Sequence, residues 1–253
     1  MAKYDNIAKT YHEIRIAGKA FYNEYYEVPA MLKLLPKVSG KNVLDLGCGS
    51  GVYTKILLKR GAKVVGVDIS KNMIDIAKIY APGAKYLCQD MAKLRLPKNY
   101  FDIAFSSLAV PYLVERLPML KAVYKSLKKN GVFLFSITNP LMEIKDSFDK
   151  GTKHYSLIGY VYDNKKKKVE IHGDYFKSKW VLSRWRASRW GRVIAIRHYH
   201  RTLEYIINTC VKSGFNITGL YEPQPINIGK KYDAMHYKLR KQLPYFMILK
   251  LQK

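Results

Sequence analysis

Short apolar runs alternate with amphipathic stretches through the first half of the chain. Continuous apolar runs are typical of buried parallel strands, and they predict strands at 42–46, 63–67, 85–88, 101–106 and 132–137. Between these runs, apolar residues recur at helical spacing, which predicts helices at about 50–60, 70–80 and 117–128. This alternation with short links predicts an α/β fold, in which a mostly parallel sheet carries helices on both faces.

The regions before and after this alternating part have different patterns. Two helices are predicted ahead of the first strand, the second at 21–35 and ended by Pro36. Between 139 and 200 the regularity is lost, but 153–162 and 169–176 predict the two strands of a β-hairpin and 193–199 a further strand. A helix at 202–213, stopped by Gly214, and strands at 215–221 and 245–251 complete the prediction.

A glycine-rich turn, VLDLGCGSG at residues 43–51, joins the first strand to the first helix of the alternating part. Glycine at 47, 49 and 51 lets the backbone adopt unusual angles, and it lets a nucleotide-like ligand approach the main chain at the carboxyl edge of the sheet. Asp68 ends the second strand, where a carboxylate can accept hydrogen bonds from both hydroxyls of a ribose. The G-x-G-x-G spacing disfavours a dinucleotide dehydrogenase, whose fingerprint is G-x-G-x-x-G.

These motifs, with the strand ends YLCQDM at 86–91 and YFDIAFS at 100–106, resemble the class I S-adenosylmethionine-dependent methyltransferases. The resemblance covers roughly 40–140 and, more loosely, the whole chain. It implies a Rossmann-like fold with a seven-stranded sheet. It also implies S-adenosyl-L-methionine as cofactor and S-adenosyl-L-homocysteine as product. A weaker resemblance, from His200 to Pro223, is to a branch of the family that acts on small molecules.

The resemblance also assigns roles around the cofactor. Residues 47–51 would face its methionine portion and Asp45 its amino-acid end, while Asp68 would hold the ribose. Ile69 would pack on the adenine, and Asp90 would bond the adenine amino group. The expected cofactor-binding set is Asp45, Gly47, Cys48, Gly49, Gly51, Asp68, Ile69, Asp90, Met91, Ser106 and Tyr11.

The same resemblance divides one domain, 1–253, into four parts. These are an N-terminal helical lid at 1–38, a cofactor-binding core at 39–140, a β-rich insertion covering the substrate at 141–200, and a C-terminal helix with two strands at 201–253. In the family, a segment similar to Tyr4-Asp-x-Ile-Ala-x-x-Tyr11 lies over the cofactor. Tyr4 and Tyr11 are therefore candidate pocket residues, although packing of this helix onto the sheet explains them equally well.

The cofactor supplies its own leaving group, so the enzyme mainly has to align the reacting atoms, which can contribute about 7–11 kcal/mol. A base is needed only for a nucleophile that arrives protonated. His200 and His198 are the candidate catalytic bases, with His154 and Tyr160 as weaker ones. The alternative is that His198 and His200, which alternate along a strand, serve only in packing or hydrogen bonding.

The chain carries 45 Lys+Arg against 19 Asp+Glu, a net charge of +26. This excess favours anionic partners such as RNA, phosphorylated metabolites or anionic lipid, unless it is simply a charged surface. Trp180, Trp185 and Trp190 recur among arginines, a combination that suits single-stranded RNA or a cover over an aromatic or phosphorylated acceptor. The candidate substrate-binding residues are Tyr4, Arg201, Trp180 and Trp185.

Several features exclude other chemistry. The segment at the end of the fourth strand reads Ser106-Ser107-Leu108-Ala109 and lacks the Asn/Asp-Pro-Pro-aromatic motif of many nucleic-acid amino methyltransferases. No Pro-Cys follows this strand, which argues against the covalent cysteine mechanism used on cytosine C5. Three scattered cysteines predict reduced thiols and no metal site. The chain lacks an apolar run of 18 residues and a signal-peptide core, which predicts no transmembrane segment and a cytoplasmic protein.

We therefore expect direct in-line methyl transfer to an oxygen, nitrogen or carbon of a small molecule, anionic or aromatic in character. Three alternatives stay open: an RNA (tRNA or rRNA) methyltransferase, a quinone or lipid methyltransferase at an anionic membrane surface, and a binding protein without turnover. The sequence makes no prediction of the oligomeric state.

Overall fold

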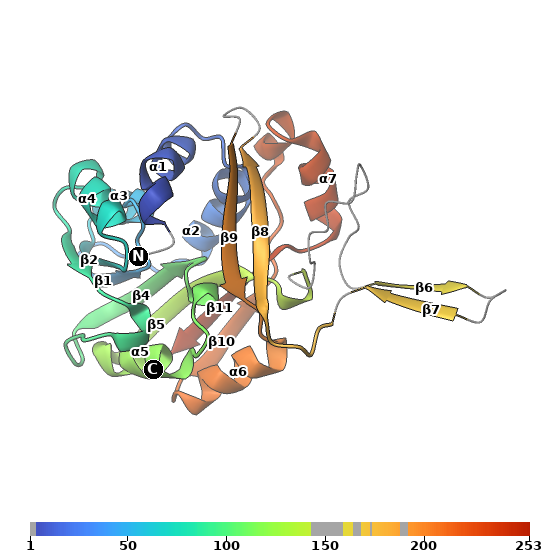
Figure 1. Ribbon diagram of the computed structural model, residues 1–253. Coiled ribbons are helices and arrows are strands. Elements are labelled where there is room, and N and C mark those ends of the chain that lie inside the picture. Colours follow the sequence, from blue (N-terminus) through green and yellow to red (C-terminus); the bar gives the residue numbers. More distant parts are fainter. Residues whose placement is uncertain (1–3, 143–158, 164–167, 173, 188–191) are drawn as a thin grey trace.

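A seven-stranded sheet in the order β10-β11-β5-β4-β1-β2-β3 forms the centre of the molecule (Figure 1). The computed structural model describes residues 4–142, 159–163, 168–172, 174–187 and 192–253. The strands are β1 (Asn42–Leu46), β2 (Lys63–Asp68), β3 (Lys85–Cys88), β4 (Phe101–Ser107), β5 (Leu127–Thr138), β10 (Asn216–Tyr221) and β11 (Phe246–Gln252). Strands β1 to β5 pair in parallel, whereas β11 pairs antiparallel with both β5 and β10. This confirms the predicted α/β fold with a mostly parallel sheet.

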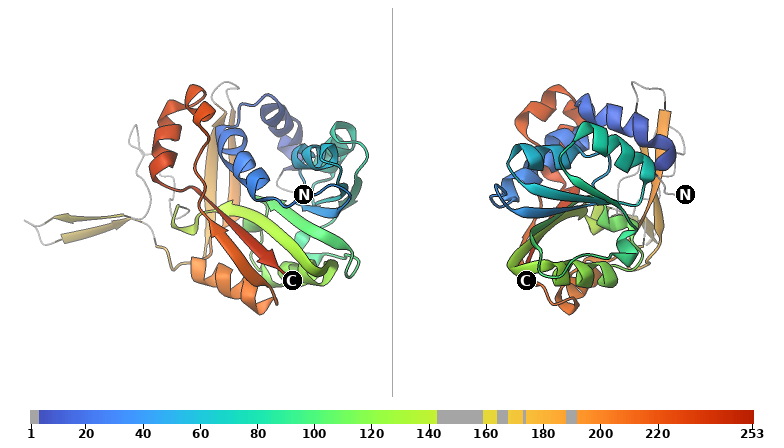
Figure 2. Two further views of the ribbon diagram at one scale, coloured as in Figure 1. Left: turned by 180° about the vertical axis from the view of Figure 1, so that it is seen from behind. Right: turned by 90° about the vertical axis from the view of Figure 1, so that its left-hand side faces the viewer.

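Successive side chains of the central strands point to opposite faces, and each face is covered by helices. In β5, Phe133 and Phe135 belong to the core with α5 (Leu117–Ser126) and α6 (Leu203–Lys212). Leu134, between them, packs with α2 (Val28–Leu34) and α3 (Val52–Lys59) on the other face. Figure 2 shows these two helical layers, with α4 (Lys71–Tyr80) on the side of α3. The strand β5 begins earlier than predicted. Leu127 already pairs with Phe101 of β4, and after a register shift the regular pairing resumes at Val132 with Ile103.

The N-terminal part consists of η1 (Asp5–Ile7), α1 (Ala8–Ile16) and a π-helical turn η2 (Asn23–Glu27) that leads into α2. The helix predicted at 21–35 therefore exists, but its first turn is wider than an α-helix. Pro29 has no N–H to donate to the Tyr25 carbonyl, which instead accepts from the distant Ile226 N at 2.9 Å. A single proline thus frees a backbone acceptor that ties this helix to the C-terminal region.

The insertion contains two separate hairpins. The first, β6 (Gly159–Asp163) and β7 (Lys168–His172), confirms the predicted hairpin but is shorter than predicted, and Phe176 lies outside it. It extends away from the central sheet, whereas the second hairpin, β8 (Trp180–Ala187) and β9 (Arg192–Tyr199), stands across the sheet (Figure 1). The sequence predicted β9 but not β8. His154 and Trp190 lie outside the described residues.

A further helix, α7 (Ala234–Gln242), and the 3₁₀ turn η6 (Asn227–Lys231) lie between the last two strands and were not predicted. Their apolar residues face outward, so the usual core-facing stripe is missing from the sequence. Short 3₁₀ turns complete the described elements: η3 (Met91–Lys93), η4 (Val110–Tyr112) and η5 (Pro140–Met142).

Candidate functional site

The glycine turn leaves the carboxyl end of β1 at the middle of the sheet. Gly47, Gly49 and Gly51 have φ of 76°, 52° and 83°, the left-handed region that favours glycine. A Cβ on Gly47 would lie 2.2 Å from Ala109 Cβ, so no larger residue fits there. At Gly49, by contrast, no atom lies within 4 Å of the place a Cβ would take. The main chain at Gly49 is therefore open to a ligand.

Asp68 is built into the turn by two backbone hydrogen bonds. Its Oδ2 accepts from Gly49 N and its Oδ1 from Ser70 N, both at 2.9 Å. Burial raises the pKa of Asp68, although these bonds oppose the shift. Each carboxylate oxygen keeps a lone pair, so both remain able to accept from ribose hydroxyls. Ile69, beside it, has half of its surface exposed (51%) and offers an apolar face to a ligand.

Asp45 lies under the turn and is almost fully buried. Its Oδ2 accepts from Thr54 Oγ1 at 2.6 Å, and burial raises its pKa to about 7. A cationic ligand group nearby would favour the ionised carboxylate, since an opposite charge lowers the pKa of an acid. The ionisation of Asp45 therefore depends on the charge placed beside the glycine turn.

The other predicted cofactor residues make contacts around the same edge. Ser106 Oγ donates to Leu46 O at 2.8 Å and links β4 to β1. Asp90 caps η3 through Ala92 N at 2.8 Å, and the Met91 side chain lies beside Gly47. Cys48 is buried, and burial raises the pKa of its thiol well above the usual value. The Cys48 thiol therefore stays protonated.

The N-terminal segment is fastened across this edge at two points. Asp5 accepts from Ser70 Oγ at 2.5 Å, and Ser70 also caps α4, as predicted, by accepting from Met73 N. On α1, His12 Nδ1 lies 3.0 Å from Ser50 Oγ in the glycine turn. The segment predicted as a lid therefore bridges the start of α4 and the turn itself.

Three tyrosines meet where this segment contacts η4, the short turn that follows β4. The hydroxyls of Tyr4 and Tyr112 are 2.6 Å apart, and the Tyr4 and Tyr11 rings pack edge to face with centroids 5.5 Å apart. Burial raises the pKa of both Tyr4 and Tyr112, which therefore stay protonated. We call Tyr4, Tyr11 and Tyr112 the tyrosine cluster; it brings the two predicted tyrosines together with one that the sequence did not single out.

Arg15 is a second residue that sequence analysis missed. It is buried on α1, where its Nε donates to Glu24 at 2.6 Å and its Nη1 to Tyr11 OH at 3.0 Å. Its Nη2 is buried and has no hydrogen-bond partner among the described residues. A buried, unsatisfied guanidinium nitrogen is costly unless a ligand completes it. A carboxylate is the natural partner for such a group.

Glu27 is the third missed residue. It is fully buried, and its carboxyl accepts from Ser136 Oγ at 2.5 Å, Ser107 Oγ at 2.9 Å and Tyr53 OH at 2.6 Å. Burial raises its pKa, against the effect of these donors. Since the two serines come from the carboxyl ends of β4 and β5, Glu27 joins the N-terminal part to the functional edge of the sheet. Its only sequence signal is a charge beside the inward-facing Val28 and Met31.

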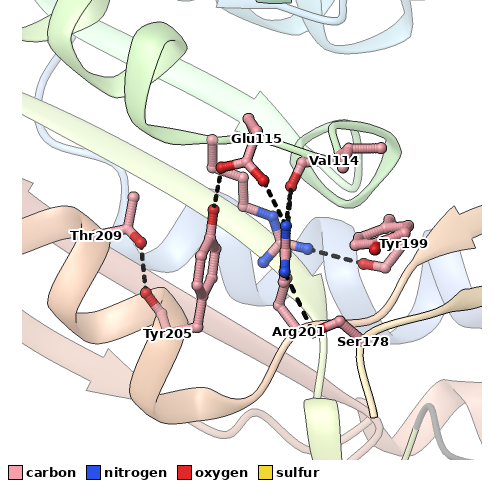
Figure 3. Close-up of polar contacts among 8 residues, drawn as sticks. Val114, Glu115, Ser178, Tyr199, Arg201, Tyr205 and Thr209 are labelled. Carbon is pink, nitrogen blue, oxygen red and sulfur yellow. Dashed lines mark hydrogen bonds and ion pairs between the residues drawn. The ribbon is translucent and has the colours of Figure 1, made fainter.

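The neighbouring residues His200 and Arg201 hold the second hairpin in place, and Figure 3 shows the contacts of Arg201. His200 is fully buried, and its Nε2 donates to Tyr175 O at 2.8 Å, so that nitrogen cannot accept a proton. Arg201 bonds Glu115 at 2.6 Å and Val114 O at 3.0 Å, and its guanidinium lies over the Tyr199 and Tyr205 rings.

Arg116 extends this connection by donating to Tyr199 O at 3.1 Å. The base of the β8–β9 hairpin is thereby bound to the loop that follows β4. His198, on β9, is nearly buried, and β9 also contacts η4, which carries Tyr112. Trp180 packs edge-on against Tyr199 and remains 43% exposed, while the backbone of Trp185 pairs with Ile194.

Comparison with known proteins identifies the family. The model of the methyltransferase domain family matches residues 44–135. An uncharacterized protein of Haemophilus influenzae is 30% identical over 228 residues, covering 87% of this chain and 84% of that protein. The ubiquinone biosynthesis O-methyltransferase of Coxiella burnetii is 30% identical over 183 residues, covering 68% of this chain and 74% of the relative. An S-adenosylmethionine-dependent methyltransferase of Mesorhizobium loti has the same fold, with a TM-score of 0.67, 27% identity and coverage of 90% and 97%.

The chain belongs to the class I S-adenosylmethionine-dependent methyltransferases, and its cofactor is S-adenosylmethionine. Two observations fit that cofactor: Gly49, at the sheet edge, leaves its main chain open to a ligand, and on α1 the buried Nη2 of Arg15 has no hydrogen-bond partner among the described residues. In the part of the chain that the structure describes, no cluster of three His, Cys, Asp or Glu side chains is suited to hold a metal. The described helices include none long and apolar enough to cross a membrane.

Proposed function

We propose that this methyltransferase acts on a small molecule, transferring the methyl group to an oxygen by direct in-line displacement. The observation that carries the proposal is the N-terminal segment, which is hydrogen-bonded to Ser70 and Ser50 and packs the tyrosine cluster against η4, just after β4; we infer that this segment covers the acceptor. An aromatic cover of this kind suits a compact, partly apolar acceptor better than a polymer. The O-methyltransferase relative from Coxiella burnetii supports an oxygen acceptor.

On this proposal the two ends of the cofactor are held by opposite sides of the site. Asp68 would accept from the ribose hydroxyls and Ile69 would lie against the adenine, with Asp90 next to it. Arg15 Nη2 would donate to the carboxylate and Asp45 would face the ammonium, beneath the glycine turn. The cofactor supplies a sulfonium leaving group, so the chain's own contribution is to orient both partners and exclude water.

We propose His198 as the base, if the acceptor hydroxyl needs one. His200 was the other candidate, but its Nε2 already donates to Tyr175 O. His198→Gln should lower kcat at least about tenfold with cofactor affinity unchanged, because general base catalysis contributes at least about a hundredfold where it operates. An unchanged kcat for His198→Gln would exclude His198 as the base.

The test uses methyl-labelled S-adenosylmethionine, the purified protein and a cell extract, with the label then separated into RNA, protein, lipid and small solutes. Label in the small-solute fraction supports the proposal and supplies a molecule to identify. Label confined to RNA or protein overturns it. The Asp68→Ala variant is the control, because it should lose labelling of every fraction if the label is transferred at this site.

A further inference from the structure

The surface formed by residues 226–243 has its apolar side chains turned outward. Met235 on α7 is 70% exposed and Tyr232 just before it 61%. We call this the 226–243 surface, and its exposed apolar members are Ile226, Ile228, Tyr232, Met235, Leu239 and Leu243. Monomeric soluble proteins seldom gather so many exposed apolar side chains in one place without using them for binding.

The inner face of α7 carries a charged side chain, Arg240, of a kind that ordinarily faces water. Arg240 is buried, donates from Nε to Tyr22 OH at 3.2 Å and lies over the Tyr245 ring at 4.5 Å. Met235 and Leu239, four residues apart, share the outer face instead. The helix is therefore inverted relative to an ordinary surface helix, whose apolar stripe packs against the core.

The surface is held rigidly by the N-terminal part. Ile226 N donates to Tyr25 O at 2.9 Å, and the Tyr25 and Tyr232 rings stack with centroids 4.2 Å apart. Gly229 packs closely on Tyr25 and Phe21. The apolar side chains of this surface therefore point outward although the backbone that carries them is packed against the protein.

The charged residues of the 226–243 surface indicate which kind of partner it binds. Residues 226–243 hold five basic residues and one acidic residue, and that acid, Asp233, is engaged with His236 through two contacts. Lys230, Lys231 and Lys238 are exposed beside the apolar side chains. A second copy of a chain with a net charge of +26 would bring like charges together, which opposes self-association.

We propose that the 226–243 surface docks the protein on an anionic lipid bilayer. Apolar side chains on one side of a short helix, flanked by lysines, match the composition of helices that lie in the membrane interface. The lysines would be attracted by the negative surface potential, and Met235 and Leu239 would enter the headgroup and acyl boundary. The proposal holds whichever acceptor is methylated, since it rests on this surface alone.

The test is sedimentation with phosphatidylcholine vesicles, with or without about one third phosphatidylglycerol, at low and high salt. The wild type should sediment with anionic vesicles only, and high salt should weaken the binding. Two pairs of substitutions, Met235→Ser with Leu239→Ser and Lys230→Gln with Lys231→Gln, should each weaken binding by roughly tenfold or more.

Matched controls alter the same chemistry elsewhere on the surface. Ile79→Ser with Val211→Ser removes two exposed apolar side chains, and Lys59→Gln with Lys63→Gln removes two exposed charges. These controls should bind like the wild type. Equal loss in test and control variants would assign binding to the overall charge and overturn the proposal.

Other occupants give distinct results. A dimer in solution that Met235→Ser with Leu239→Ser dissociates would assign the surface to a second copy. Binding to polyglutamate that needs Met235 and Leu239, without vesicle binding, would assign it to an acidic protein. Each of these outcomes would overturn the lipid proposal.

Discussion

The buried contact between Thr54 and Asp45 predicts a destabilisation that depends on pH. Burial raises the pKa of Asp45 from 3.8 to about 7, and a shift of about three units corresponds to roughly 4 kcal/mol for ionising the carboxyl in the folded protein. Because the folded state favours the protonated form, this contribution to stability is present below about pH 4 and is lost as the pH rises to about 7. The Thr54 hydroxyl reduces the loss by donating to the ionised carboxylate at 2.6 Å.

Thr54→Val keeps the shape of the side chain and removes the donor. A hydrogen bond to a charged group contributes about 1.5–3 kcal/mol, so its loss should raise the pKa of Asp45 by a further one to two units, approximately. At about pH 6, where Asp45 is protonated in both proteins, the variant should be less stable by about 1 kcal/mol. At about pH 9 the deficit should grow to roughly 2–4 kcal/mol.

Urea unfolding at the two pH values measures this difference directly. Thr54→Ser is the matched control, because it keeps a hydroxyl at the same carbon and should show no growth of the deficit with pH. A deficit for Thr54→Val that is the same at both pH values would refute the reasoning, since it would show that Asp45 does not ionise in this range.

Three further predictions concern the site. Gly47→Ala should abolish cofactor binding in calorimetry, because its Cβ would lie 2.2 Å from Ala109 Cβ and distort the turn. Gly49→Ala meets no protein atom, so it should cost only about 1 kcal/mol of backbone strain in the free protein, but it should weaken cofactor binding because its Cβ would occupy the space left open for the ligand. Arg15→Lys should weaken S-adenosylmethionine binding about tenfold through the loss of Nη2, and an unchanged Kd would remove Arg15 from the cofactor site. Tyr4→Phe should lower the free energy of unfolding by only about 1 kcal/mol, since it removes a single hydroxyl contact to Tyr112; a larger loss in thermal unfolding would show that the lid depends on this bond.

The parts of the molecule that sequence predicted are those with local patterns. The strands and the glycine turn follow from apolar runs and from glycines at fixed spacing, and the cap at Ser70 depends on residues three positions apart. The N-cap and the turn were therefore predictable from a few neighbouring residues. The assignments of Ile69 and Asp90 to the adenine rest on the family resemblance and stay predictions.

The missed residues depend on contacts between distant parts of the chain. Glu27 meets Ser107 and Ser136, which are 80 and 109 positions away, and no local pattern encodes such a meeting. Arg201, whose predicted substrate binding stays a prediction, likewise contacts residues far away in the chain, Val114 and Glu115, which are 87 and 86 positions before it. The sequence shows that Glu27 and Arg201 are charged, but only the fold shows which residues they contact.

The place of β11 in the sheet has a consequence for how the protein is made. This strand follows both β5 and β10 in the chain, yet it lies between them in the sheet, with Met247, Leu249 and Leu251 buried in the main core. Until β11 has been synthesised and has inserted, β5 and β10 each have an open edge, and open edges invite pairing with other chains. The sheet is therefore complete only once β11 has inserted, which makes the interval before that step the one in which this chain most needs protection.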